Sequence, residues 1–143
     1  MSQPPVDVRV ALSIDASPEQ VFDAWLDPAR ARRFLFATAA GEMVRAEIDP
    51  RVGGRFTMVD RRDGVDVEHT GTYVELDRPR RLVFDFGVPA YSDHRTRVSV
   101  DVAPHGDGAS DVSLTAHDVP AEHAERARAG WGTMLDALAA AVD

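Results

Sequence analysis

The sequence predicts an α+β domain in which a curved antiparallel sheet wraps around a long C-terminal helix. Successive short segments alternate apolar and polar residues, which is typical of strands with one buried face. The last part of the chain instead places its apolar residues at helical spacing. The length of 143 residues fits one ordinary domain. Because no repeat or linker divides the chain, we expect a single domain over residues 1–143.

The first strand and the two helices after it have the clearest local signals. Apolar residues alternate from Val6 to Ile14, which predicts a half-buried strand. Ser17-Pro18-Glu19-Gln20 combines an N-cap serine, a proline at the first helical position and a glutamine that can close a capping box. Asp27-Pro28 repeats the cap-plus-proline signal, so we expect a second short helix that runs towards Phe34.

The middle of the chain predicts a run of antiparallel strands. Asp63-Gly64 lies between two alternating segments and is a strong hairpin signal. We expect loops at 38–41 and 89–94 and turns at 49–54, 77–79 and 104–108. The expected strands are Met43–Ile48, Arg55–Asp60, Val65–Leu76, Arg81–Val88, and two further segments around Val98–Val102 and Val112–Ala116.

The terminal helix is expected to begin at Asp118-Val119-Pro120, with Asp118 near its cap. Its apolar stripe consists of Ala124, Ala127, Trp131, Met134, Leu135, Leu138 and Val142. Gly130 interrupts this stripe, and a glycine there costs about 1 kcal/mol relative to alanine. We expect Gly130 to pack closely on the sheet, and the alternative is that it leaves room for a ligand.

The composition excludes several classes of partner and chemistry. The net charge of −8 argues against binding to nucleic acid or to an anionic membrane. Cysteine and lysine are both absent, which excludes disulfides, thiolate nucleophiles and Schiff bases. The absence of lysine and asparagine, which have A/T-rich codons, indicates a GC-rich bacterial genome.

The sequence also predicts where the protein resides. No apolar run reaches the roughly 20 residues that a membrane helix needs. Met1–Pro5 has neither a basic nor an apolar region, so we do not expect a signal peptide. The cytoplasm is the expected location.

The predicted arrangement implies an internal cavity. A sheet with one apolar face needs a cover, which the helices must supply. Long strands twist and curl, and one helix cannot fill a curled sheet along its whole length. We therefore expect residual space between the sheet and the terminal helix.

The order of elements resembles the helix-grip fold of the START-like (SRPBCC) superfamily. Within it, the chain is most similar to the C-terminal domain of the activator of the ninety-kilodalton heat-shock chaperone's ATPase. The resemblance covers nearly the whole chain. It is carried by Ser17–Phe22 leading into Trp25–Pro28, by Gly53-Gly54, by Gly71–Leu76, by Pro79–Phe84, and by Gly130-Trp131 with Met134, Leu135 and Leu138.

The chain departs from this family at the expected cavity wall. Many relatives carry tryptophan where this chain has Phe34 and Phe36, and Thr-Trp where it has Asp85-Phe86. The ligand preferences of the family therefore do not transfer. The chaperone activator has a further N-terminal domain that the resemblance does not include, so a cochaperone role does not follow from it.

His69 and Tyr73 are the sharpest candidates for a functional site. Both lie on the face of their strand that carries Val67, so they would place polar groups in an apolar wall. The competing interpretation is that both are satisfied internally or emerge at the strand edge. The complete set of expected ligand-binding residues is His69, Tyr73, Phe34, Phe36, Phe56, Phe84, Phe86, Trp131 and Met134.

Other polar residues fit structural roles. Asp85 should face outwards, and His123 should lie on the polar side of the terminal helix. Asp93-His94 should lie in a turn, and the alternative is a position near a cavity mouth. The five histidines have no zinc-type spacing, and no serine-nucleophile or phosphate-loop motif is present. We therefore assign no catalytic residue, metal or cofactor.

Three functions are consistent with the sequence. The first is a non-catalytic carrier or sensor of a small hydrophobic molecule. The second is an enzyme similar to the polyketide cyclases and hydrolases of the superfamily, for which His69 with Tyr73 is the one available polar pair. The third is a module that binds a chaperone, another protein or a second copy of the chain through its outer surface. A filled cavity would favour the first two, and a solid interior with a broad apolar patch would favour the third.

Overall fold

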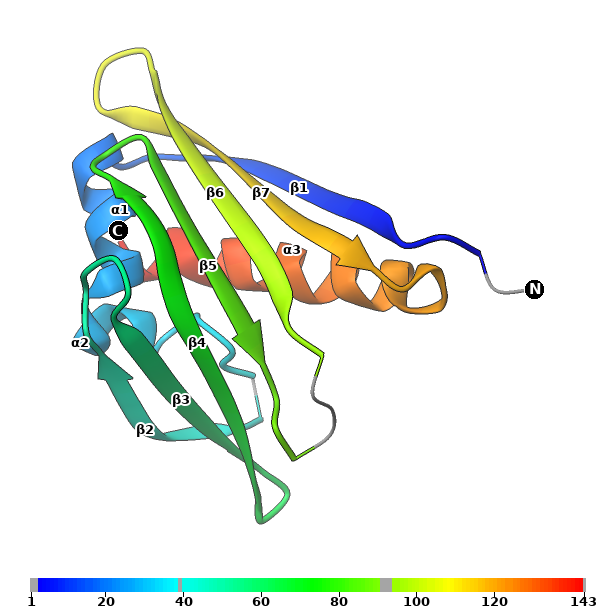
Figure 1. Ribbon diagram of the computed structural model, residues 1–143. Coiled ribbons are helices and arrows are strands. Elements are labelled where there is room, and N and C mark those ends of the chain that lie inside the picture. The colour runs from blue at the N-terminus through cyan, green and yellow to red at the C-terminus, as the bar shows by residue number, and fades with distance from the viewer. Residues whose placement is uncertain (1–2, 39, 91–93, 143) are drawn as a thin grey trace.

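The computed structural model describes residues 3–38, 40–90 and 94–142 and contains one seven-stranded antiparallel sheet. Its spatial order is β1-β7-β6-β5-β4-β3-β2, so six consecutive strands form a meander and the first strand lies beside the last (Figure 1). The strands are β1 (Val6–Ile14), β2 (Glu42–Ile48), β3 (Arg55–Arg62), β4 (Val65–Asp77), β5 (Arg81–Gly87), β6 (Thr96–His105) and β7 (Ala109–Val119).

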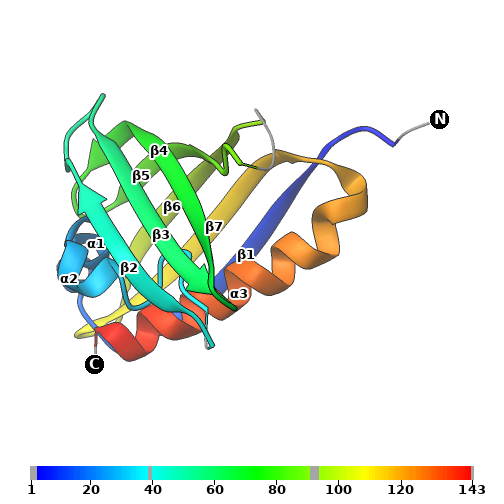
Figure 2. The ribbon, with the colours of Figure 1, turned by 90° about the horizontal axis from the view of Figure 1, so that it is seen from below.

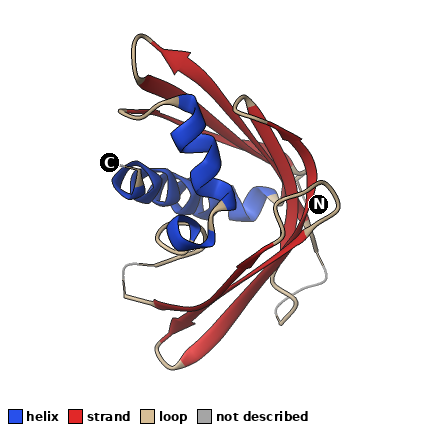
Figure 3. Ribbon diagram, turned by 90° about the vertical axis from the view of Figure 1, so that its left-hand side faces the viewer, coloured by secondary structure: helices blue, strands red, loops and turns tan. Residues whose placement is uncertain are grey.

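The helices all lie on the concave side of this sheet (Figure 3). They are α1 (Pro18–Leu26), α2 (Pro28–Ala31), the short 3-10 helix η1 (Ala121–His123) and α3 (Ala124–Ala141). Helix α3 runs beneath β1, whereas α1 and α2 close one end of the sheet (Figure 2). The predicted α+β fold, with a curved sheet wrapped around a terminal helix, is therefore confirmed.

Local signals place the two short helices as predicted. The Ser17 side chain accepts a hydrogen bond from the Gln20 backbone N–H, and the Gln20 side chain accepts one from the Ser17 backbone N–H. Both halves of the capping box are thus present. Asp27 caps α2 by accepting from the Ala29 backbone N–H at 3.0 Å. Helix α2 ends at Ala31, and turns then lead the chain to Phe34.

The expected start of the terminal helix is wrong. Asp118 lies in β7 with a φ of 54°, and its backbone N–H donates to the Asp7 carboxylate at 3.1 Å. Strand pairing therefore continues to Val119, which lies opposite Val6 on β1. Helix α3 begins only at Ala124, and its cap residue His123 makes no side-chain capping bond.

A glycine in the middle of β4 allows aromatic packing against the sheet. A Cβ atom built on Gly71 would lie 2.2 Å from the ring of Phe56. Only a residue without a side chain lets that ring approach the strand so closely. Phe56 contacts Phe84 on the far side, with ring centroids 5.5 Å apart, so β3, β4 and β5 share one continuous apolar layer.

The core is densest between the sheet and the helices α1, α2 and the C-terminal half of α3. Trp25 meets Phe34 edge-on, with ring centroids 5.0 Å apart, and both side chains are fully buried. Leu135 and Leu138 fill the same region from α3.

Among the described residues, no helix is long and apolar enough to cross a membrane.

Candidate functional site

A cleft of about 520 Å³ lies where the N-terminal half of α3 faces β4 and β5. We define the α3 cleft by its apolar wall, which consists of Phe36, Phe86, Ala127, Trp131 and Met134. Its volume lies within the range of about 300–1,000 Å³ that is usual for small-molecule sites. The cleft lies between the sheet and the terminal helix, where the sequence predicts residual space.

Small residues on α3 create this cleft. Gly130 lines it and is exposed, and a Cβ atom built on Gly130 would meet no atom within 4 Å. The expectation that Gly130 packs closely on the sheet is thus wrong. The helix leaves room at this position because Ala127, Ala129 and Gly130 present almost no side-chain volume to the strands.

His69 projects from β4 into the wall of the cleft. The ring stacks on Phe36, with centroids 4.3 Å apart and planes inclined by 10°. His69 is only 7% exposed, and its Nδ1 atom has no hydrogen-bond partner. Burial, with a smaller contribution from the nearby Arg62 guanidinium, lowers the pKa of His69 from 6.5 to about 4. The imidazole is therefore neutral at physiological pH.

A buried polar cluster holds the segment that carries Phe36. Asp60 is fully buried on β3 and accepts hydrogen bonds at 2.8 Å from Thr38 Oγ1 and from Arg62 Nε. Arg62 also donates to the Phe36 carbonyl at 3.0 Å. Phe36 has a φ of 58°, a conformation that costs free energy in a bulky residue. The cluster therefore fixes the Phe36 ring against His69.

Sequence reasoning missed the Asp60 cluster, although a signal was present. Phe56, Met58 and Asp60 alternate along β3, and the first two face the core. Period-two alternation places the carboxylate on the same inward face. A charged residue at an inward position needs partners there, which predicts a polar cluster at that end of the strand.

The structure separates the nine expected ligand-binding residues into two groups. Five line the α3 cleft, namely Phe36, His69, Phe86, Trp131 and Met134. The other four lie in the packed core outside the cleft wall, namely Phe34, Phe56, Tyr73 and Phe84.

His69 and Tyr73 do not form a catalytic pair. They lie four residues apart on one strand, which corresponds to about 13 Å along it. The Phe56 ring lies over Gly71 between them. Tyr73 is 3% exposed, its hydroxyl has no hydrogen-bond partner, and burial raises its pKa. The enzyme hypothesis therefore loses the polar pair on which it depended.

A second cavity of about 370 Å³ lies on the other side of Trp131. It shares Phe86, Ala127 and Trp131 with the α3 cleft. The rings of Phe86 and Trp131 meet edge-on, with centroids 5.6 Å apart, and form the partition. His123 lines this second cavity and belongs to η1. The sequence predicted that it lies on the polar side of the terminal helix.

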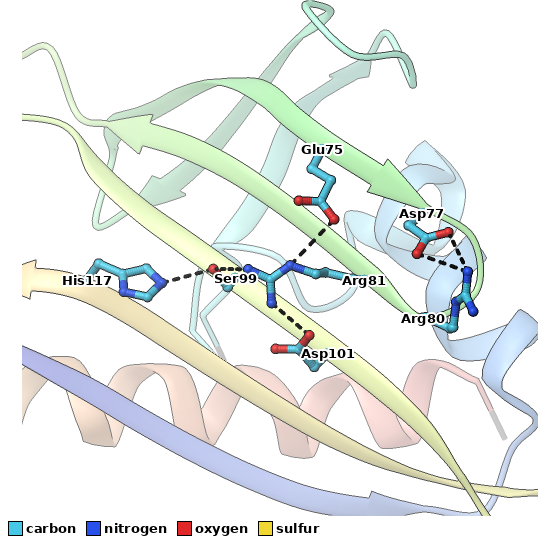
Figure 4. Close-up of polar contacts among 7 residues, drawn as sticks. All are labelled: Glu75, Asp77, Arg80, Arg81, Ser99, Asp101 and His117. Carbon is cyan, nitrogen blue, oxygen red and sulfur yellow. Dashed lines mark hydrogen bonds and ion pairs between the residues drawn. The ribbon is translucent and has the colours of Figure 1, made fainter.

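The outer face of the sheet carries a row of polar contacts (Figure 4). Ser99 Oγ lies 2.9 Å from His117 Nε2, and His117 Nδ1 lies 3.7 Å from an Asp7 carboxylate oxygen. Arg81 donates to the same hydroxyl at 3.4 Å and to Asp101 at 2.8 Å. Asp85 also faces outwards, as expected, and pairs with Arg97 at 2.8 Å.

The Asp7-His117-Ser99 series does not form a nucleophilic centre, despite its order of groups. Ser99 is 4% exposed, lies in the middle of β6 and lines none of the cavities described above. Strands β5 and β7 pair with β6 on both sides, which leaves no free backbone amides at Ser99 to stabilise an oxyanion. The row is a set of cross-strand contacts that stabilise the sheet.

The described residues contain no group of three or more histidines, aspartates or glutamates that could hold a metal ion. Asp93, for which a turn was expected, lies outside the described residues.

Comparison with known protein families identifies the family of this chain. The family model of Activator of Hsp90 ATPase homolog 1-like proteins matches residues 15–143. The chain belongs to this family. Its fold and its neighbours place it in the START-like (SRPBCC) superfamily, as the resemblance implied.

Solved structures of bacterial proteins share the fold of this AHSA1-like chain. A Chromobacterium violaceum protein is 27% identical with a TM-score of 0.85, and the alignment covers 95% of this chain and 96% of that one. An AHSA1-like protein from Aeromonas hydrophila is 26% identical with a TM-score of 0.78, covering 94% and 92%. A Staphylococcus aureus protein of unknown function is 18% identical with a TM-score of 0.81, covering 96% and 94%. No curated protein matches the chain.

Proposed function

We propose that this AHSA1-like protein binds a small apolar molecule in the α3 cleft, as a non-catalytic carrier or sensor. The observation that carries the proposal is a cleft of about 520 Å³ with aromatic walls and a buried histidine, His69, whose Nδ1 atom has no hydrogen-bond partner. Ligand sites typically combine a largely apolar wall with a few placed polar groups. The superfamily assignment is consistent with a ligand-binding domain.

The site supports binding better than catalysis. A catalytic site needs an acid or base within hydrogen-bond reach of a second group, and His69 has no such neighbour in the cleft. With a pKa near 4, His69 is also a weak base. A neutral imidazole surrounded by aromatic rings is suited to form one hydrogen bond with a bound molecule.

A protein-interaction role has less support. Among the described residues, the exposed large apolar side chains are all valines and include no aromatic ring. They are spread over β1, β2, the turn before β3 and the two ends of β4, namely Val6, Val44, Val52, Val65 and Val74. Stable interfaces usually present aromatic side chains at a contiguous core.

The binding proposal can be tested with a neutral fluorescent probe, N-phenylnaphthylamine. We expect the wild-type protein to bind it, with brighter dye emission and a change in Trp131 emission. Gly130→Phe fills the cleft and should weaken binding about tenfold or more, which corresponds to a loss of at least about 1.4 kcal/mol.

Gly132→Phe is the matched control, because Gly132 lies two residues further along α3, has open space around it and does not line the cleft. Equal binding by Gly130→Phe, Gly132→Phe and the wild type would place the dye elsewhere and refute the proposal. Native mass spectrometry of freshly purified protein would show whether a natural molecule is retained.

A further inference from the structure

The polar groups of the α3 cleft differ in whether they already have partners. Thr38 donates to Asp60, and Thr133 donates to the Ala129 carbonyl at 3.0 Å. Arg62 is engaged by Asp60 and by the Phe36 carbonyl. Two ionisable side chains of the described wall remain. His69 leaves its Nδ1 atom without a hydrogen-bond partner, and Arg126 makes no hydrogen bond or ion pair with the described residues.

The charges at the cleft sum to a single uncompensated positive charge. The buried Asp60 carboxylate pairs with Arg62 Nε at 2.8 Å and neutralises its charge. No aspartate or glutamate lies among the described residues of the cleft wall. Glu125, the acidic neighbour of Arg126 in sequence, pairs with Arg128 at 2.8 Å. The imidazole of His69 is neutral, so the charge of Arg126 stands alone in a chain whose net charge is −8.

The position of Arg126 on the helix also favours a negatively charged ligand group. It lies in the first turn of α3, where the aligned peptide dipoles give the helix a partial positive charge. The aromatic rings of Phe36, Phe86 and Trp131 line the same cleft. The wall thus offers apolar surface on one side and one cationic group on the other.

We propose that the ligand of the α3 cleft is a monoanionic amphiphile, with an apolar ring or chain among the aromatic side chains and a single acidic group paired with Arg126. The inference rests on the proposed function and adds the chemical class of the ligand. A carboxylate, a sulfonate and a phosphodiester share the required chemistry.

Two dyes with the same aromatic skeleton test this charge preference. N-phenylnaphthylamine is neutral, and anilinonaphthalene sulfonate carries one additional sulfonate. We expect the wild type to bind the sulfonate about fivefold more tightly, as one partly exposed ion pair of about 1 kcal/mol would give. High salt should reduce that preference, because it screens exposed charges.

The variant Arg126→Gln should remove the preference, so that the sulfonate binds about as tightly as the neutral dye. Arg9→Gln is the matched control, since Arg9 is an exposed arginine that does not line the cleft, and its loss changes the net charge by the same amount. Displacement of the neutral dye by decanoate, but not by its methyl ester, would extend the preference to carboxylates. Displacement by a decyl phosphodiester as well would show that any single anionic group suffices.

The outcomes separate the two proposals. Binding of the neutral dye with no preference for the sulfonate, or a preference that persists in Arg126→Gln, would overturn the monoanion proposal and leave the binding site standing. Failure of both dyes to bind the wild type would overturn both proposals.

Discussion

The two halves of helix α3 make opposite contributions to the interior. In the C-terminal half, Leu135 and Leu138 are fully buried against the end of the sheet that α1 and α2 close. In the N-terminal half, Ala127 and Gly130 present almost no side-chain volume, and a cleft of about 520 Å³ lies beneath them. The same helix therefore stabilises the fold at one end and leaves space at the other, according to the size of its side chains.

The largest expected effect compares the stability lost at the packed end of α3 with the stability lost beside the cleft. Leu138→Ala should lower the free energy of unfolding by about 3 kcal/mol, because it opens a cavity in a packed region. Met134→Ala should cost less than about 1.5 kcal/mol, because Met134 borders existing space and is only partly buried. Urea denaturation of both variants at neutral pH measures the difference. Equal losses would mean that α3 is packed as tightly beside the cleft as it is around Leu138.

The next effect is a pH dependence that arises from the cleft. The pKa of His69 is about 4 in the folded protein and 6.5 as its ordinary value. The unfolded chain therefore binds the proton first as the pH falls. The stability from neutral His69 is fully present above pH 6.5 and is lost as the pH falls towards 4, by up to about 3 kcal/mol.

Replacing His69 with phenylalanine should remove that slope, since the ring can still stack on Phe36. Denaturation curves recorded between pH 7 and pH 4 for the wild type and His69→Phe would show it as a difference between the two proteins. His123→Gln is the control, because it replaces an exposed histidine that does not line the α3 cleft. Parallel pH profiles for wild type and His69→Phe would contradict the burial of a neutral imidazole.

A smaller effect tests the cluster that holds Phe36. Thr38→Val removes a hydrogen bond to the buried Asp60 and should cost about 2 kcal/mol, since bonds to charged groups exceed neutral ones. Thr133→Val removes a bond from an exposed residue to a helix carbonyl and should cost less than about 0.5 kcal/mol. Thermal unfolding of the two variants compares them directly. Similar costs would show that Asp60 does not depend on Thr38.

The smallest effect is a gain in stability. Gly130→Ala should stabilise the protein by about 1 kcal/mol, because alanine favours a helix and open space surrounds this position. Gly132→Ala should give a similar gain, since its surroundings are also open. A loss of stability in Gly130→Ala alone would contradict the open space at this position and favour the interpretation that Gly130 packs closely on the sheet.

The local elements could be predicted well from the sequence, because their signals are local. The capping box at Ser17 and Gln20 and the Asp63-Gly64 hairpin need only neighbouring residues, and both are present. Asp63 and Gly64 both adopt positive φ angles, as a tight hairpin turn requires. The start of α3 was missed because the pairing of β7 with β1 extends the strand through Asp118, and that partner is distant in sequence.

The candidate site was predicted only in part. Alternation along β4 placed His69 on the inward face, and spacing placed Trp131 and Met134 on the helix stripe. The same reasoning did not distinguish Tyr73 and Phe34, which lie in the packed core, from the residues of the cleft. Periodicity shows which face of an element is buried and gives no information on what lies opposite.

The sequence by itself determined the order of the elements, the inward face of each strand and the absence of thiol and lysine chemistry, since these depend on local spacing and composition. Only the tertiary structure decided where the interior is solid, that Gly130 adjoins open space, and that Asp60 holds the segment of Phe36 through Thr38 and Arg62. The physical reason is that packing depends on the volumes of side chains that meet across the fold, and those neighbours are set by the curvature of the sheet.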